Sequence, residues 1–507
     1  MAGKRRSGVI MHISSLPGSF GSGDFGSGAR CFAGMLAGAG FSIWQVLPLT
    51  PVDPALGNSP YSSASAFAGN SMFISPELLC EEGLVHPEEA ERFKTASGRH
   101  SDFKHASFCR NELLRAAFEN FTGKSGNFEQ MRSDFALFCS EETHWLDDYA
   151  LFRVIKDNNG GRCWAEWPHE LAFRGKAALS AFALAHTREI LFVKFEQFIF
   201  FRQLKSLSAL CAELGVTLFG DIPIYTAWDS ADVWSNKEIF CLEADGSQRG
   251  QAGVPPDYFS KTGQLWGNPL YDWKAMERGG FAWWRRRISH TLKYCGMVRI
   301  DHFRGLCAYW DIPAGEKTAE KGRWRQASGR EMLSAFSRDM YGAPLPLVAE
   351  DLGVITDDVR QLMQEFALPG MSVLLFAFGS GADNPYLPHN VARCSVIYTG
   401  THDNDTVRGW WDTDASDAEK KSFADYAGTE ITSENAARVM TRMALSSTAD
   451  TAVVPMQDIL GLGSECRMNT PSLPLGNWTW RMLPSESERF SADLGAFYKK
   501  MNAVYGR

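Results

Sequence analysis

Residues 297–303 have the sequence MVRIDHF, an apolar run that ends in charged and polar side chains. Seven other short runs rich in β-branched and aromatic residues recur along the chain, at 8–13, 42–49, 216–224, 345–351, 371–378, 395–401 and 451–457. Each run is continuous rather than alternating, which is typical of strands buried on both faces. Stretches with helical character, such as 193–214 and 357–367, lie between them. This pattern predicts an α/β protein, a (β/α)8 TIM barrel, with a doubly wound sheet as the alternative.

The spacing of these runs is uneven. The segments at about 51–205 and about 226–295 are longer than a crossover helix requires. We therefore expect two large insertions, the first a mainly helical subdomain and the second loop-rich, projecting over the active site. Because polar linkers and low-complexity tracts are absent, we expect one catalytic barrel domain spanning residues 1–507.

Composition excludes several classes of function. The chain is 45% hydrophobic and carries a net charge of −8, so it lacks the basic excess of a nucleic-acid-binding protein. No apolar stretch approaches the length of a membrane span, and His12 interrupts the short apolar run near the N-terminus. The eleven cysteines show no metal-binding spacing, which predicts reduced thiols and a cytoplasmic protein. We expect no nucleic-acid partner and no membrane partner, and protein partners remain unknown.

Polar residues gather where several predicted strands end. They are Asp221, Arg299, Asp301, Glu350, Asp351, His402 and Asp403. Active sites of barrels lie at the carboxyl ends of the strands, and a charge at the tip of an apolar strand is costly unless it is paired or functional. One such residue would be an ordinary structural carboxylate. Four such strand ends at one barrel face indicate an active site.

Two carboxylates on neighbouring strands suggest glycoside chemistry. Arg299 and Asp301 are two apart on a strand, so they share a face, and the arginine would keep the carboxylate ionised, as a nucleophile requires. For an isolated pair of this kind, a structural ion pair is the alternative. Glu350 supplies a second acid one strand away, about 4.8 Å in a parallel sheet. That spacing permits the roughly 5–5.5 Å carboxyl separation of retaining glycosidases.

Two further motifs allow more than one interpretation. His402 and Asp403 follow a predicted strand and could bind adjacent sugar hydroxyls, or Asp403 or Asn404 could cap the next helix. Residues 21–26, GSGDFG, match a dinucleotide-binding pattern. However, residues 14–20 separate them from the strand, and no acid follows about twenty residues later. We interpret them as a glycine-rich barrel loop that lets the backbone approach the substrate.

Several blocks in order make a resemblance specific. The segments 299–304 (RIDHFR), 349–353 (AEDLG) and 401–404 (THDN) resemble the catalytic blocks of the amylomaltase family, the 4-alpha-glucanotransferases of glycoside hydrolase family 77 in the α-amylase clan. Supporting blocks are SSLPG at 14–18, GNSPY at 57–61, GDIPIY at 220–225, GVPPDYF at 253–259, WGNP at 266–269 and RMNTP at 467–471. The matches run from residue 7 to about 481. Ser472 stands where the family pattern has a glycine.

The resemblance implies a 4-alpha-glucanotransferase that moves α-1,4-glucan segments to the 4-hydroxyl of glucose or another glucan, with retention and without a metal or organic cofactor. It implies that Asp301 is the nucleophile, Glu350 the general acid/base and Asp403 the residue that binds and distorts the donor sugar. The implied substrate-binding residues are Tyr61, Asp221, Arg299, His402, Tyr258, Phe259, Gln264, Trp266, Asn268 and Asn469. For each aromatic residue, core packing is the alternative.

Two other functions stay open from the sequence. An α-amylase-like retaining hydrolase would use the same three carboxylates on water. A catalytically inactive glucan-binding protein is disfavoured because those carboxylates and Arg299 are all present. Transfer requires an acceptor bound well enough to outcompete water. The aromatic, glycine-rich stretch at 254–266 is the candidate for that role.

Overall fold

A computed structural model describes residues 5–123, 127–256, 260–471 and 473–507. Within them, eight parallel strands form one sheet in the order β10-β11-β12-β1-β2-β3-β6-β9. A hydrogen bond of 2.9 Å from the Ala349 backbone N to the Pro369 carbonyl joins the two end strands, so the sheet closes into a barrel. The strands are β1 (Arg6–Ile10), β2 (Ile43–Gln45), β3 (Thr217–Ile222), β6 (Met297–Ile300), β9 (Leu347–Ala349), β10 (Gly370–Val373), β11 (Ser395–Tyr398) and β12 (Thr451–Pro455).

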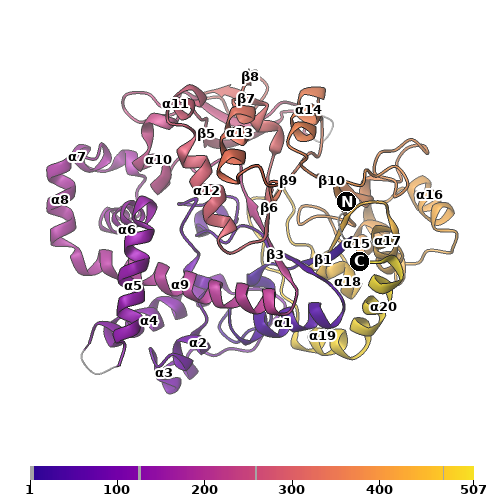
Figure 1. Cartoon of the computed structure of the whole chain (residues 1–507), viewed down its shortest axis with the longest axis horizontal. Helices are drawn as coiled ribbons and strands as arrows, with labels where there is room; N and C mark the ends of the chain where they lie inside the picture. The colour runs from indigo at the N-terminus through magenta and orange to yellow at the C-terminus, as the bar shows by residue number, and fades with distance from the viewer. Residues whose placement is uncertain (1–4, 124–126, 257–259, 472) are drawn as a thin grey trace.

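This arrangement confirms the predicted barrel and all eight predicted strands. Each strand ends before the predicted boundary, because the last residues of each predicted run leave the ladder and enter loops or short helices. Helices surround the strands in the centre of Figure 1. They include α1 (Ser27–Gly38), α9 (Thr187–Glu213), α12 (Ala282–Leu292), α13 (Gly329–Asp339), α14 (Asp357–Glu365), α17 (Ala436–Ser446) and α20 (Gly495–Tyr505). Among the described helices, none is both long enough and apolar enough to cross a membrane.

A group of helices between β2 and β3 lies to one side of the barrel, at the left of Figure 1. They are α2 (Pro76–Glu81), α3 (Pro87–Glu91), α4 (Phe103–Thr122), α5 (Glu129–Glu141), α6 (Thr143–Asn158), α7 (His169–Ala172) and α8 (Lys176–Ala185). An aromatic cluster joins them to the barrel helix α9. Phe121 packs against Phe195 of α9 with ring centroids 4.9 Å apart, and Phe135 packs against Phe198 at 5.5 Å. Such pairs bury large apolar areas, so α9 serves both the barrel and these helices.

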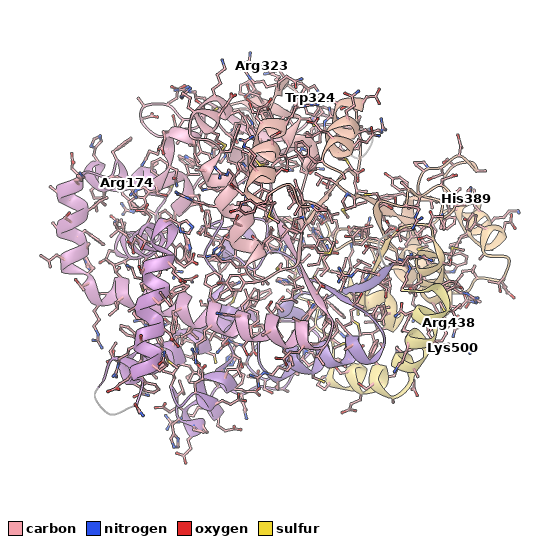
Figure 2. The ribbon with its side chains drawn as sticks, viewed as in Figure 1. Arg174, Arg323, Trp324, His389, Arg438 and Lys500 are labelled. Atoms are coloured by element: carbon pink, nitrogen blue, oxygen red, sulfur yellow. The ribbon has the colours of Figure 1, made fainter. Side chains whose placement is uncertain are left out.

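A second, antiparallel sheet stands beyond the carboxyl end of the barrel strands. Its order is β5-β4-β7-β8, and its strands are β4 (Gly250–Val254), β5 (Gln264–Pro269), β7 (Ala308–Pro313) and β8 (Arg323–Gln326). The first two precede β6 and the last two follow it. The edge strand β8 is exposed along its length, and its Arg323 and Trp324 lie at the top of the molecule in Figure 2. The sequence does not reveal this sheet, because β4 and β8 show neither a continuous nor an alternating apolar pattern.

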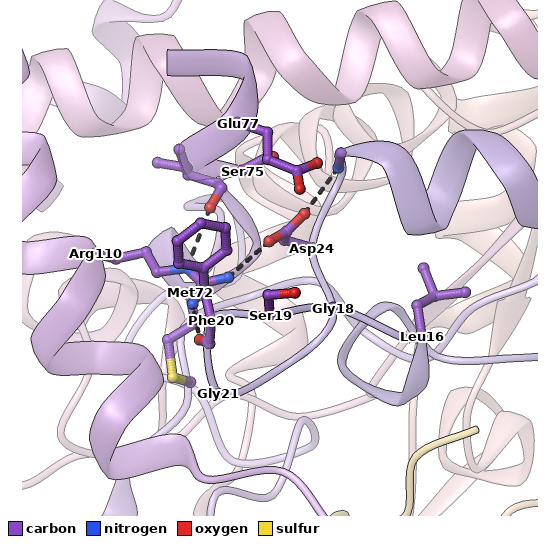
Figure 3. A network of polar contacts seen from close by, with 12 residues as sticks. Leu16, Gly18, Ser19, Phe20, Gly21, Asp24, Met72, Ser75, Glu77 and Arg110 are labelled. Carbon is purple, nitrogen blue, oxygen red and sulfur yellow. Dashed lines mark hydrogen bonds and ion pairs between the residues drawn. The ribbon is translucent and has the colours of Figure 1, made fainter. Parts of the chain in front are cut away.

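The glycine-rich stretch at 21–26 is pinned inside the protein (Figure 3). Arg110 of α4, whose side chain is 1% exposed, donates from Nη2 to Oδ2 of Asp24 at 2.8 Å and from Nη1 to the Phe20 carbonyl. Gly26 N donates to the other Asp24 oxygen at 2.9 Å. A Cβ on Gly23 would lie 2.1 Å from the Ile13 carbonyl oxygen. The expected approach of substrate to this loop is therefore wrong at Gly23, where the absent side chain makes room for the protein's own backbone.

Removing the charge of Arg110 tests this network. Arg110→Met keeps the apolar stem but leaves the buried Asp24 carboxylate without its cation. We expect the free energy of unfolding to fall by about 3–5 kcal/mol, as measured by urea denaturation followed by tryptophan fluorescence. Lys421→Met breaks the exposed ion pair with Asp425 and should cost less than about 0.5 kcal/mol. Equal losses in the two variants would contradict the role given to Arg110.

Candidate functional site

The register of the barrel strands places four charged residues together. Asp221 of β3 lies opposite Arg299 of β6, and Ile300 of β6 lies opposite Ala349 of β9. Asp301 and Glu350 follow these last two residues, so they occupy the same level at the ends of adjacent strands. The predicted cluster at the barrel mouth is therefore present.

Arg299 is the cation that this cluster surrounds. Its Nη1 donates to Oδ1 and Oδ2 of Asp221 at 2.9 and 2.8 Å, and its Nη2 donates to Oδ1 of Asp301 at 2.7 Å. Burial alone would lower the pKa of the guanidinium, but Asp221 and Asp301 raise it well above its ordinary value. Arg299 therefore stays charged and fixes both carboxylates. The side chain of Asp221 is fully buried, whereas that of Asp301 is 29% exposed, so Asp301 is the carboxylate that a ligand can reach.

Tyr61 extends the cluster from the loop that follows β2. Its hydroxyl donates to Oδ2 of Asp221 at 2.7 Å, and its ring stacks on His402 with centroids 5.1 Å apart and planes 14° apart. Burial and the charge of Asp221 raise the pKa of Tyr61, so its hydroxyl remains a neutral donor. Gln197 of α9 holds the same loop through two hydrogen bonds with the Gly69 backbone, at 2.7 and 3.0 Å.

Glu350 is bracketed by two backbone donors. His302 N donates to Oε2 and Leu352 N donates to Oε1, each at 2.8 Å. His302 has a φ of +47°, a left-handed conformation that costs energy for a residue with a side chain. The residue in this left-handed conformation is therefore the same one whose backbone N–H donates to Glu350.

Burial raises the pKa of Glu350 to about 7. The charge of Asp301 acts in the same direction, while Arg299 and the two backbone donors oppose it. Near neutral pH, Glu350 therefore exists in both protonation states. A carboxyl with this property can give a proton in one step and accept one in the next.

Asp403 is held by the segment that follows β12. Asn469 Nδ2 donates to its Oδ1 at 2.6 Å, and Arg467 Nη2 donates to its backbone carbonyl at 2.7 Å. His402 Nε2 lies 3.4 Å from the other carboxylate oxygen. The alternative in which Asp403 or Asn404 caps the next helix is wrong, because Thr406 is the capping residue of α15 (Val407–Gly409). The Asp403 side chain, 45% exposed, faces the same region as Tyr61 and His402.

The predicted acceptor-side residues lie on β5 of the second sheet. The edge of the Trp266 ring meets the His302 ring at 4.8 Å and 88°, and its Nε1 donates to Gln264 Oε1 at 3.1 Å. Asn268 Nδ2 donates to the Thr226 carbonyl at 2.8 Å. Core packing does not explain Trp266, which is 36% exposed. The predicted residues Tyr258 and Phe259 lie outside the described part of the chain.

Sequence reasoning missed three contributors to this region. Two are the backbone N–H groups of His302 and Leu352, which have no side-chain signature. The third is His12, which with His402 and Gln457 lines a small adjoining pocket. Burial lowers the pKa of His12 to about 3, so its ring is neutral. The sequence could have pointed to His12, because it is a polar residue near the carboxyl end of the first predicted strand.

Comparison with known proteins gives a consistent result. Residues 11–486 match a family model described as 4-alpha-glucanotransferase. The 4-alpha-glucanotransferase of Synechocystis sp. is 44% identical over 510 residues, covering 100% of this chain and 99% of the relative. That of Aquifex aeolicus is 43% identical, with 99% of each chain covered.

Solved structures agree with the sequence relatives. An amylomaltase from Streptococcus agalactiae in complex with acarbose superposes with a TM-score of 0.94 at 33% identity, covering 99% of this chain and 100% of that one. An amylomaltase from Corynebacterium glutamicum, at 17% identity, shares the fold with a TM-score of 0.81 over 98% of this chain and 75% of its own.

The central role of Arg299 predicts a pH-dependent loss of stability. Arg299→Met leaves the buried Asp221 without its cation, and we expect the free energy of unfolding at pH 8 to fall by about 3–5 kcal/mol. Burial already raises the pKa of Asp221. Without the arginine, ionised Asp221 is disfavoured in the folded state above that pKa, and protonation relieves the cost below it. The deficit should therefore be smaller at pH 5.

Urea denaturation at both pH values measures this difference. Arg323→Met, which removes an exposed guanidinium paired with Asp311, is the control and should lose little at either pH. If the stability lost in Arg299→Met is the same at both pH values, Arg299 is not the cation that compensates the buried charge of Asp221.

Proposed function

This chain belongs to the 4-alpha-glucanotransferase family, and we propose that Asp301, Glu350 and Asp403 are the residues with which it transfers α-1,4-glucan segments. Its activity is that of a 4-alpha-glucanotransferase. The observation that carries the assignment of roles is the contrast between two carboxyls. Asp301 is bonded to the Arg299 cation, whereas Glu350 has a pKa raised to about 7. One is suited to attack and the other to move a proton.

The proposed reaction is a double displacement with retention. Asp301 attacks the anomeric carbon of the donor while Glu350 gives its proton to the departing glycosidic oxygen. The C–O bond to the leaving glucan breaks, and a glycosyl ester of Asp301 forms. Glu350, now ionised, takes the proton from the 4-hydroxyl of an acceptor glucan as that oxygen attacks the same carbon. Asp301 is released, and a new α-1,4 bond has formed.

The neighbouring residues support the donor sugar in this proposal. Asp403 accepts hydrogen bonds from its hydroxyls and favours the distorted ring, and the amide of Asn469 fixes the Asp403 carboxylate. Tyr61 presents an aromatic face beside His402. Arg299 orients the nucleophile Asp301 through a hydrogen bond, and Asp221 holds Arg299 in place. The related amylomaltase from Streptococcus agalactiae was solved in complex with acarbose, which supports a sugar-binding site in this chain.

We further propose the division of the chain and the range of its substrates. One catalytic barrel spans residues 1–507, with insertions at about 51–205 and about 226–295, and the second covers the acceptor side through Gln264, Trp266 and Asn268. Tyr258 and Phe259 would join them there. The α-1,4-glucans concerned are maltodextrin, starch or glycogen chains. The eleven free thiols support a cytoplasmic location.

Incubation with maltotriose tests the transfer reaction directly. We expect glucose together with maltopentaose and longer products, because the shortened donor is passed to another sugar. Asp301→Asn should lower the rate by more than about 1,000-fold, since the amide cannot form the ester. Asp405→Asn, two residues beyond Asp403, is the matched control and should retain activity. Glucose and maltose alone would show hydrolysis and contradict the role of the acceptor side.

The proton role of Glu350 predicts the pH dependence. The first step needs the protonated carboxyl, and burial holds its pKa at about 7. We expect kcat/KM for maltotriose to decline above about pH 7, approaching a tenfold loss per pH unit. Initial rates between pH 5 and pH 9 measure this limb. A decline that begins near pH 5 would mean that the pKa of Glu350 is not raised in the free enzyme.

A further inference from the structure

We propose that Arg304 is a positioning residue for Glu350, because its guanidinium ties together the two loops whose backbone N–H groups bracket the Glu350 carboxyl. This inference rests on the proposed function, in which Glu350 is the general acid/base. The two loops are the nucleophile loop, residues 301–306, and the acid/base loop, residues 350–356. Arg304 closes the motif RIDHFR, in which no other role has been assigned to it.

The contacts of Arg304 cross from one loop to the other. Its backbone belongs to the nucleophile loop, and its Nη1 donates to the Val354 carbonyl at 2.7 Å and to Thr356 Oγ1 at 3.2 Å. Leu352 and Ile355 of this loop pack against the core, but Val354 between them is 72% exposed. The hydrogen bonds from Arg304 therefore restrain the loop at Val354 and Thr356.

Both loops supply a donor to the same carboxyl. His302, in the nucleophile loop, donates to Oε2 of Glu350, and Leu352, in the acid/base loop, donates to Oε1. Two backbone bonds of 3.1 Å also join the loops at their base, from Glu350 N to the Ile300 carbonyl and from Phe303 N to the Glu350 carbonyl. Arg304 closes the open end of this arrangement. Its loss would let Leu352 move away from Oε1.

Trp324 of β8 covers the guanidinium. The Arg304 guanidinium carbon lies 4.1 Å from the centroid of the Trp324 ring, a close cation–π contact. Trp324 is 41% exposed and stands at the edge of the second sheet, labelled in Figure 2, with Trp310 beside it on β7. A planar guanidinium can lie flat on a ring while its N–H groups donate in its own plane, a combination that the compact ammonium of lysine does not match. The contact with Trp324 therefore favours arginine over lysine.

A change in the bracketing donors has a defined electrostatic consequence. The hydrogen bonds from His302 and Leu352 favour ionised Glu350 and lower its pKa, against the larger effect of burial. Arg299 of β6 and Asp301, which follows β6, also act on the pKa of Glu350. The charge of Glu350 in turn contributes to the raised pKa of Tyr386, which precedes β11. None of these three contacts Arg304. Loosening Leu352 should therefore raise the pKa of Glu350 while the other groups stay in place.

The test uses Arg304→Lys, which keeps the positive charge but loses the planar fork. We expect kcat/KM for maltotriose to fall roughly 10- to 100-fold. We also expect the basic limb of its pH profile to move up by about 0.5–1 pH unit, the size of one lost hydrogen bond. Trp324→Leu is the second variant and should move the limb in the same direction. Arg323→Lys, on the same strand but paired with Asp311, is the control and should leave both quantities unchanged.

A second donor separates failure of this inference from failure of the proposed function. α-Maltotriosyl fluoride needs no proton from Glu350, because fluoride leaves unaided. With this donor, Glu350→Ala should form the covalent glycosyl-enzyme, detected by intact-protein mass spectrometry, although it is inactive on maltotriose. If no adduct forms, the proposed function is wrong. If the adduct forms but folded Arg304→Lys and Trp324→Leu keep the wild-type limb, the positioning role of Arg304 is overturned.

Discussion

The buried charge of Arg299 is the constraint on which the barrel mouth depends. Removing a guanidinium from water costs several kcal/mol, and only well-placed partners offset that cost. The register of β3 and β6 supplies Asp221 directly opposite, and Asp301 follows two residues along on the same face. Tyr61 and His402 then build outward from Asp221. The arrangement of the strands thus orients the site before any ligand binds.

The segments outside the barrel complete this site by holding its loops. The helices between β2 and β3 pack on α9, and Gln197 of α9 fastens the loop that carries Tyr61. The second sheet brings Trp266 against His302 and Trp324 against Arg304. The helices between β2 and β3 and the second sheet therefore each support one wall of the mouth. The barrel supplies the charged centre, and these segments decide how precisely the loops around it are placed.

Much of the fold and of the site could be predicted from the sequence, for definite physical reasons. Strands buried on both faces leave continuous apolar runs, and charges at their ends stand out against that background. The second sheet could not be predicted, because the exposed β8 and the glycine-containing β4 show no pattern of apolar residues typical of a strand. The side chains of Asp301, Glu350 and Asp403 were found by motif. The donors to Glu350 were not, because any residue carries a backbone N–H, and the left-handed φ of His302 has no signature in its identity.

The neighbours of β1 also bear on how the chain is made. This first strand pairs with β2 on one side and with β12 on the other, and Met482 N donates to the Ser15 carbonyl close by. During synthesis, one edge of β1 has no partner until nearly the whole chain has emerged. Contacts so distant in sequence slow folding, and an open strand edge invites pairing with other chains. The late synthesis of β12 therefore leaves one edge of β1 open to other chains for most of the time that the chain is being made.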